Sequence, residues 1–155
     1  MKPVLHFTIF LFTVVSLSSC IKVVDTTPQA AVNPITGSWV LAGATENDGY
    51  GWQSFSPGFE TGIFDFYGNG AAQYTDSYST LSGSWYTTLS SAGYYDEYGV
   101  YYNDAHQSFQ TQLSDAYGSG TLNLYFDYIN FLGPDSFVAT YYDGKYIERF
   151  TFNRY

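Results

Sequence analysis

From Ile35 onward the chain consists of short runs rich in Tyr, Phe, Thr, Val and Trp, separated by Gly, Asn and Asp. No long window in this part carries apolar residues at the spacing of a helix. Aromatic and β-branched residues favour strands, whereas Gly, Asn and Asp favour the turns between them. The pattern therefore predicts an all-β domain over residues 35–155.

Short turn signals divide this region into strands. Asp143-Gly144 is a two-residue turn between two β-rich runs, and Gly68-Asn69-Gly70 separates another pair in the same way. We expect eight strands, at residues 37–44, 61–67, 71–78, 82–90, 106–114, 121–131, 136–142 and 145–154.

The fifth of these strands has a helical alternative. Asn103 could cap a helix that presents Phe109, Leu113 and Tyr117 at intervals of four residues. We favour a strand, because residues 121–131 need a partner of matching length across the turn that precedes them.

Alternation along the strands assigns one apolar face to the interior. Successive antiparallel strands with short links predict an up-and-down meander, and eight strands can close into a barrel that leaves no free edge. A closed antiparallel barrel is the predicted architecture, with a β-sandwich as the alternative. The expected inner face consists of Trp39, Leu41, Phe64, Phe66, Leu81, Trp85, Leu89, Leu122, Leu124, Phe126, Tyr128, Phe137, Tyr141, Tyr146, Phe150 and Phe152.

The first twenty residues are typical of a targeting segment. Lys2 precedes an apolar run at residues 4–17, which is shorter than the roughly 20 residues of a membrane-spanning helix. The run ends in Leu17-Ser18-Ser19-Cys20, which resembles the lipobox of bacterial lipoproteins. The resemblance implies cleavage before Cys20 and a diacylglycerol on its thiol. Residues 1–19 would then be the signal peptide, 20–34 a lipidated tether and 35–155 the β-domain.

The net charge and the residues after Cys20 suggest where the protein is located in the cell. The formal net charge of -9 argues against nucleic acid as a partner, because phosphate binding needs a basic surface. Ile21 stands where an inner-membrane retention signal has Asp, and no acidic run follows Cys20. We expect a protein held in the cell envelope by its lipid, most simply at the outer membrane, facing the periplasm or exposed at the surface.

Two motifs at the ends of the domain suggest a family. Gly37-Ser38-Trp39 opens the first expected strand and Arg154 ends the last. This pairing is similar to that of lipocalins, and the whole region resembles small lipocalin-like lipoproteins of the Bacteroidetes type. The resemblance implies that Arg154 packs over Trp39 and closes one end of an eight-stranded barrel. It conveys a fold more than an activity.

Two long loops carry the candidate ligand or partner contacts. Aromatic faces beside carboxylates and amides could stack on sugar rings or anchor a protein, or they could fold back over the barrel as lids. In a simple meander the two loops, 45–60 and 91–105, lie at opposite ends, so we expect no single site built from both. The candidate residues are Tyr50, Trp52, Phe55, Tyr94, Tyr95 and Tyr98.

Catalytic patterns are sparse. After Cys20 the chain holds one histidine, His106, and it contains no G-x-S-x-G motif and no calcium-binding loop pattern. We therefore expect no enzyme, no cofactor and no metal. The expected function is a non-catalytic binding or interaction module of unknown ligand, with an interior filled mainly by side chains. A glycan-binding envelope protein and a purely structural one are the alternatives.

The lipid anchor gives the first test. In a bacterial host the wild-type protein should partition into detergent and carry the mass of an acylated cysteine, because the thiol of Cys20 is the acceptor. Cys20→Ala should lose both properties. A soluble, unacylated wild-type protein would contradict the lipobox assignment.

Overall fold

The computed structural model describes residues 33–155, and every regular element among them is a β-strand. The strands are β1 (Gly37–Asn47), β2 (Trp52–Ser54), β3 (Ile63–Phe66), β4 (Ala71–Thr75), β5 (Thr80–Ser90), β6 (Tyr94–Tyr95), β7 (Tyr101–Tyr102), β8 (His106–Ser114), β9 (Thr121–Phe126), β10 (Tyr128–Gly133), β11 (Ser136–Tyr142) and β12 (Ile147–Arg154). The predicted all-β class is confirmed. No helix long and apolar enough to cross a membrane occurs in this part of the chain.

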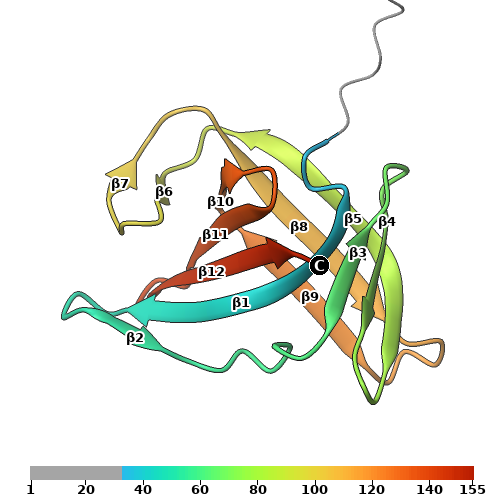
Figure 1. Cartoon of the computed structure of the whole chain (residues 1–155). Coiled ribbons are helices and arrows are strands. Elements are labelled where there is room, and N and C mark those ends of the chain that lie inside the picture. Colours follow the sequence, from blue (N-terminus) through green and yellow to red (C-terminus); the bar gives the residue numbers. More distant parts are fainter. Residues whose placement is uncertain (1–32) are drawn as a thin grey trace, which may run out of the picture. The chain divides into compact units, whose positions relative to one another are not determined.

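Ten of these strands form one antiparallel sheet (Figure 1). Its order is β10-β11-β12-β1-β3-β4-β5-β8-β9. The short strand β2 pairs with the end of β1, on the edge that also pairs with β3 and opposite the edge that pairs with β12. Figure 1 shows the sheet curling round, so that β1 and β12 face β8 and β9 across the interior. Strands β6 and β7 form a separate hairpin. The helical alternative for residues 106–114 is wrong, because this segment is β8 and pairs with β5 and β9.

The closed barrel that the sequence predicted is not formed. The hydrogen-bonded path ends at β9 and β10, which follow each other along the chain with only Asp127 between them. β9 pairs with β8, whereas β10 pairs with β11. The segment predicted as one strand therefore changes partner at Asp127, and no continuous ladder closes the sheet. The resulting open, curled sheet is compatible with the sandwich alternative.

The change of partner also reverses which side chains point inward. Before the break, Phe126 is buried in the core; after it, Ile129 and Phe131 belong to the core. Tyr128 instead stacks on Tyr94 of the outer hairpin, with ring centroids 4.7 Å apart. Strict alternation placed Tyr128 inside, which is wrong, because a one-residue irregularity moves every later side chain to the other face.

A second irregularity lies in β1. The register with β12 shifts between Leu41 and Gly43, so that Leu41 pairs with Phe152 and Ala44 pairs with Phe150. Ala44 is buried in the core, whereas alternation from Leu41 alone would have turned it outward. Because of this bulge, Glu46, two residues further along, lies on the inner face of the sheet.

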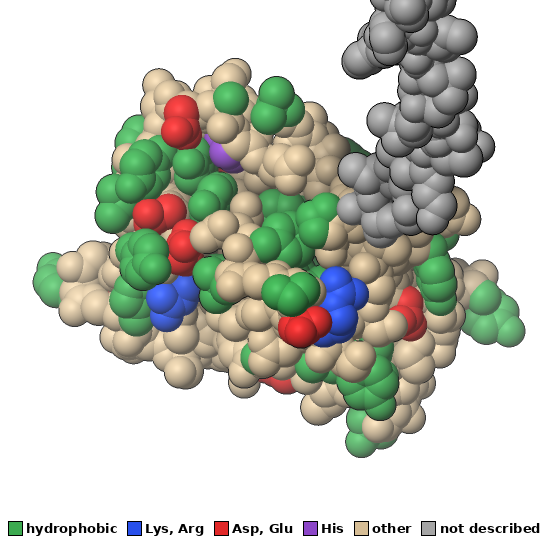
Figure 2. Space-filling view, turned by 45° about the horizontal axis from the view of Figure 1, so that its top comes forward, with side chains coloured by type: hydrophobic (Ala, Val, Ile, Leu, Met, Phe, Trp, Pro, Cys, Tyr) green, Lys and Arg blue, Asp and Glu red, His purple; other side chains and the backbone are tan. Residues whose placement is uncertain are grey.

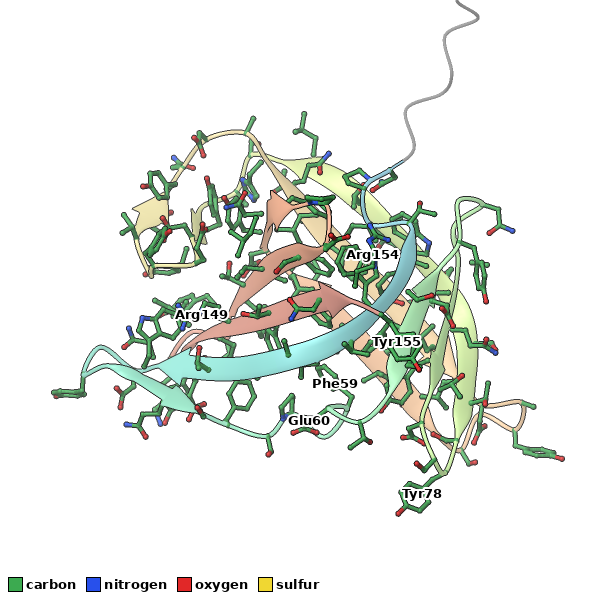
Figure 3. The ribbon with its side chains drawn as sticks, in the orientation of Figure 1. Phe59, Glu60, Tyr78, Arg149, Arg154 and Tyr155 are labelled. Atoms are coloured by element: carbon green, nitrogen blue, oxygen red, sulfur yellow. The ribbon has the colours of Figure 1, made fainter. Side chains whose placement is uncertain are left out.

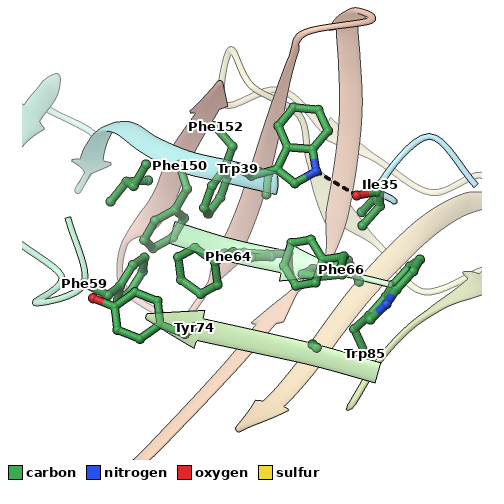
Figure 4. Packing of buried hydrophobic residues seen from close by; sticks show 14 of the residues in the cluster. Ile35, Trp39, Phe59, Phe64, Phe66, Tyr74, Trp85, Phe150 and Phe152 are labelled. Carbon is green, nitrogen blue, oxygen red and sulfur yellow. Dashed lines mark hydrogen bonds between the residues drawn. The ribbon is translucent and has the colours of Figure 1, made fainter. Parts of the chain in front are cut away.

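The interior is filled by aromatic rings that pack edge to face or stacked (Figure 4). Phe64 lies at the centre of one group and contacts Phe152, Tyr74 and Phe59 with ring centroids 4.8–5.9 Å apart. Such geometries add about 0.5–1.5 kcal/mol per pair to the burial of the rings. These contacts link β3 to β4, β12 and the β2–β3 connection, and the contact of Phe126 with Phe152 links β9 to β12 across the interior.

Trp39 and Arg154 close one end of this interior. The indole of Trp39 is fully buried and donates a 2.7 Å hydrogen bond to the carbonyl of Ile35. The guanidinium of Arg154 lies 4.2 Å from the ring centroid of Trp39 and donates to the carbonyls of Pro134 and Thr36. Gly37 has φ +131°, and a Cβ there would lie 2.1 Å from an Arg154 nitrogen. Glycine at this position therefore leaves room for the arginine.

Leu89 does not lie in the core, contrary to prediction. Its side chain is 73% exposed. The hydroxyl of Thr87, two residues earlier on the same side of β5, accepts a hydrogen bond from Asn33. β5 therefore extends beyond the end of the buried interior, and alternation alone cannot predict where the interior ends.

Removing the arginine should loosen this end of the domain. Arg154→Ala should lower the free energy of unfolding by about 1–3 kcal/mol, because a cation–π contact and charge-assisted hydrogen bonds are lost. Urea denaturation measures the change. Lys145→Ala, at an exposed turn, serves as the control, and equal losses in the two variants would contradict a special role for Arg154.

Candidate functional site

An open cavity of about 400 Å³ lies at the other end of the interior. It falls within the usual size range of small-molecule sites, and its walls are mainly aromatic. Three wall residues come from the β2–β3 connection and the others from β9, β11 and β12. The lining residues are Phe55, Pro57, Phe59, Asn123, Leu124, Tyr125, Phe126, Tyr141, Glu148 and Phe150.

The cavity forms where the sheet fails to close. β9 pairs with β8 along one edge, and at Asp127 the chain turns away to pair with β11. The other edge of β9 therefore faces the ends of β11 and β12, and no hydrogen-bonded ladder joins them. Side chains bridge the gap instead: the rings of Tyr125 and Tyr141 meet edge to face at 6.1 Å, and the amide of Tyr142 donates to Asp127.

The β2–β3 connection covers this end of the interior. Phe55 meets Phe150 edge to face at 5.6 Å, and Phe59 stacks on Phe150 at 6.1 Å. Figure 3 shows Phe59 and the neighbouring Glu60 on this connection, beneath β1. Phe59 is buried and Phe55 is partly buried. The connection thus supplies a wall of the cavity and part of the core.

Two carboxylates lie on the inner face of the sheet at this end. Glu148 lines the cavity and lies on the same side of β12 as Phe150. Its register partner on β1 is Glu46, which the bulge places on the same face. Directly opposed like charges destabilise a strand pair. The two carboxylates therefore make an unfavourable contribution to the stability of the fold.

The environment of Glu148 disfavours its charged form. Burial raises the pKa of the Glu148 carboxyl above its ordinary value of 4.5, and the negative charges of Asp143 and Glu46 raise it further. Glu60, on the covering connection, shows the opposite behaviour: backbone amide groups donate to its exposed carboxylate and lower its pKa. The cavity therefore has a half-buried carboxyl group whose charge costs free energy.

The second long loop does not contribute to this cavity. Its strands β6 and β7 fold against the outer face of the sheet, where Tyr94 packs on the rings of Tyr128 and His106. Thr140, on the outer side of β11, donates to the carbonyl of Tyr95 and is almost fully buried. Burial raises the pKa of Tyr94 to about 12, with Asp104 adding to the shift. Figure 2 shows hydrophobic and acidic side chains gathered on this face.

The two long loops meet, contrary to the expectation that they lie at opposite ends. A Cβ at Gly99 would lie 3.5 Å from the ring of Trp52. Arg149 joins them: its guanidinium lies 4.1 Å from the Trp52 ring centroid and donates to the carbonyl of Glu97. Figure 3 shows Arg149 on the side of β12 that faces the β6–β7 hairpin. The hairpin lies beside the sheet and not over its end, which simple meander geometry did not anticipate.

The sequence-predicted site residues are therefore scattered. Phe55 lines the cavity, Trp52 packs against Arg149, and Tyr94 is buried under its hairpin. Tyr50 and Tyr98 are exposed. Tyr95 meets the rings of Tyr101 and Tyr142. Cys20 lies outside the described residues, as do the predicted signal peptide and most of the predicted tether.

Sequence reasoning missed the two glutamates. Glu148 could have been found, because it shares the even-numbered face of Phe150 and Phe152 and is the acidic residue on that face. Glu46 could not, because its orientation depends on the bulge at Leu41–Gly43. Tyr141 was expected on the inner face and does line the cavity.

Comparisons with known proteins add no relatives. The chain matches no protein-family model, and no curated protein or solved structure shows significant similarity to it. Within residues 33–155, no three His, Cys, Asp or Glu side chains are grouped so that they could hold a metal ion. The cavity with its carboxylate is the best-defined candidate site.

The pKa of Glu148 predicts a pH-dependent gain from its removal. Because its folded-state pKa lies above 4.5, its contribution to stability is most favourable below that pH and is lost as the pH rises. Glu148→Gln should therefore increase the free energy of unfolding at pH 7, by a few tenths of a kcal/mol. Below about pH 4 the gain should vanish.

Glu60→Gln provides a control of opposite sign. The lowered pKa of Glu60 means that its charged form is favoured in the folded state, so this variant should be less stable than wild type at pH 7. Thermal unfolding at pH 7 and pH 3.5 measures both variants. A destabilised Glu148→Gln at pH 7 would contradict the unfavourable carboxylate.

Proposed function

We propose that this protein is a lipid-anchored, non-catalytic binding module of the bacterial cell envelope that holds a small, largely apolar ligand. The observation that supports this proposal most directly is the open aromatic cavity of about 400 Å³ between β9, β12 and the β2–β3 connection. Its volume suits a small molecule and not an extended lipid or a folded partner.

The distribution of packing supports this cavity over the loop tyrosines as the ligand site. At the opposite end of the interior the rings of Trp39, Phe131 and Phe137 pack 4.7–6.5 Å apart. The open hollow of about 390 Å³ at that end is lined on one side by the guanidinium-bearing Arg154, and the described residues that line it include no acidic group. Trp52 and Tyr94, two of the strongest candidates for stacking on a sugar, are already engaged by Arg149 and Tyr128. Exposed apolar walls remain at the cavity, where ligand burial would be favourable.

The proposed localisation in the cell envelope rests on the sequence. The apolar run, its small-residue end and the position of Cys20 support a lipidated N-terminus. A lipid anchor and a small-molecule cavity together favour a protein that binds its ligand beside a membrane.

A solvatochromic dye tests the cavity directly. Residues 32–155 form one compact unit that contains every residue of the core cluster, so this fragment is suitable for binding measurements. The neutral dye N-phenyl-1-naphthylamine should gain fluorescence on binding, with saturation at one dye per domain. A fluorescence signal that does not saturate, or none at all, would overturn the proposed function.

A pair of leucine variants locates the dye. Leu124→Trp places a larger side chain at the cavity wall and should abolish dye binding, because it occupies the space that the ligand needs. Leu89→Trp makes the same change at an exposed position on β5 and should bind the dye normally. Equal binding by both variants would place the dye elsewhere.

A further inference from the structure

We infer that the ligand of this cavity is a cation, an ammonium group on an apolar or aromatic body, held with its charge beside Glu148 and Glu46. This inference rests on the proposed function and adds the chemical class of the ligand. It depends on three observations: the placement of the carboxylates, the lack of an ion-pair partner for either of them within residues 33–155, and the aromatic walls.

Glu148 stands where a ligand in the cavity would meet it, and Glu46 lies next to it on β1. Glu148 is a wall residue and is half-buried, and Glu46 is its direct partner across the β1–β12 ladder. A smaller hollow beside the cavity is lined by Glu46, Asp48 and Tyr146. The acidic groups thus extend from the wall of the aromatic cavity to the end of β1, and a bound cation would relieve their mutual repulsion.

None of the cations of the described residues forms an ion pair with either carboxylate. Arg154 lies at the opposite end and makes the one ion pair found within residues 33–155, with Asp135. Arg149 points to the outer face, between Trp52 and the carbonyl of Glu97. Lys145, at the exposed turn before β12, lies within reach of the charges of Asp143 and Asp48, and its ammonium group donates to the hydroxyl of Tyr146. Neither carboxylate at the cavity has an ion-pair partner within that part of the chain.

The aromatic walls suit the same ligand. Ring faces attract an ammonium group, and they attract it more strongly where water is excluded. Phe55, Phe150 and Tyr141 supply rings on the side of the cavity that carries Glu148. An anion would meet the carboxylate of Glu148 here, with that of Glu46 next to it, and a neutral ligand would leave both uncompensated. The net charge of -9 also favours the approach of cations over anions.

A matched series of ligands tests this inference. Octylamine, octanol and octanoate share one alkyl chain and differ in charge at pH 7. Each is used to displace N-phenyl-1-naphthylamine from residues 32–155. Octylamine should compete about fivefold more effectively than octanol, and octanoate least, because a half-buried carboxylate contributes a modest but measurable attraction.

Variants assign the preference to the carboxylates. Replacing both, in Glu46→Gln with Glu148→Gln, should reduce the preference for octylamine over octanol from about fivefold to none. Asp135→Asn, at the opposite end of the domain, should retain the preference. Dye binding with no preference for octylamine would overturn the charge assignment alone, whereas absence of dye binding would overturn the proposed function itself. A preference that survives the double substitution would also overturn the assignment to these carboxylates.

Discussion

Residues 121–133 hydrogen-bond to β8 over their first half and to β11 over their second, and the change of partner at Asp127 governs much of the structure. The break leaves one edge of β9 without a ladder, which opens the aromatic cavity. It also turns Tyr128 outward, where this ring supports Tyr94 of the β6–β7 hairpin. One local irregularity thus shapes both faces of the sheet.

The two ends of the interior differ in character. At one end Trp39 is sealed beneath Arg154, and the rings leave little space. At the other end the β2–β3 connection covers the rings only partly, and the walls include a carboxyl group with a raised pKa. Such a difference is expected of a binding module, in which a well-packed region supplies stability and a less complete one accepts a ligand.

The loops illustrate how far sequence reasoning can reach. Their aromatic residues were predicted as ligand or partner contacts, but most of these rings pack against the protein itself. Trp52 and Gly99 meet because β6 and β7 lie on the outer side of β10–β12, bridged by Arg149. The sequence holds no signal for that docking, since it depends on contacts between segments about fifty residues apart.

By itself, the sequence determined the all-β class, the approximate positions of the longer strands, the strand assignment of residues 106–114 and most of the buried face, because turn residues and alternation are local properties. It did not predict the short strands β2, β6 and β7 or the division of residues 121–131 into β9 and β10. Tertiary structure decided the rest. The bulge in β1 and the break at Asp127 arise where one strand must satisfy neighbours of different register, and each reverses the alternation beyond it. The inward turn of Glu46, the outward turn of Tyr128 and the cavity all depend on those two irregularities, which no local pattern announces.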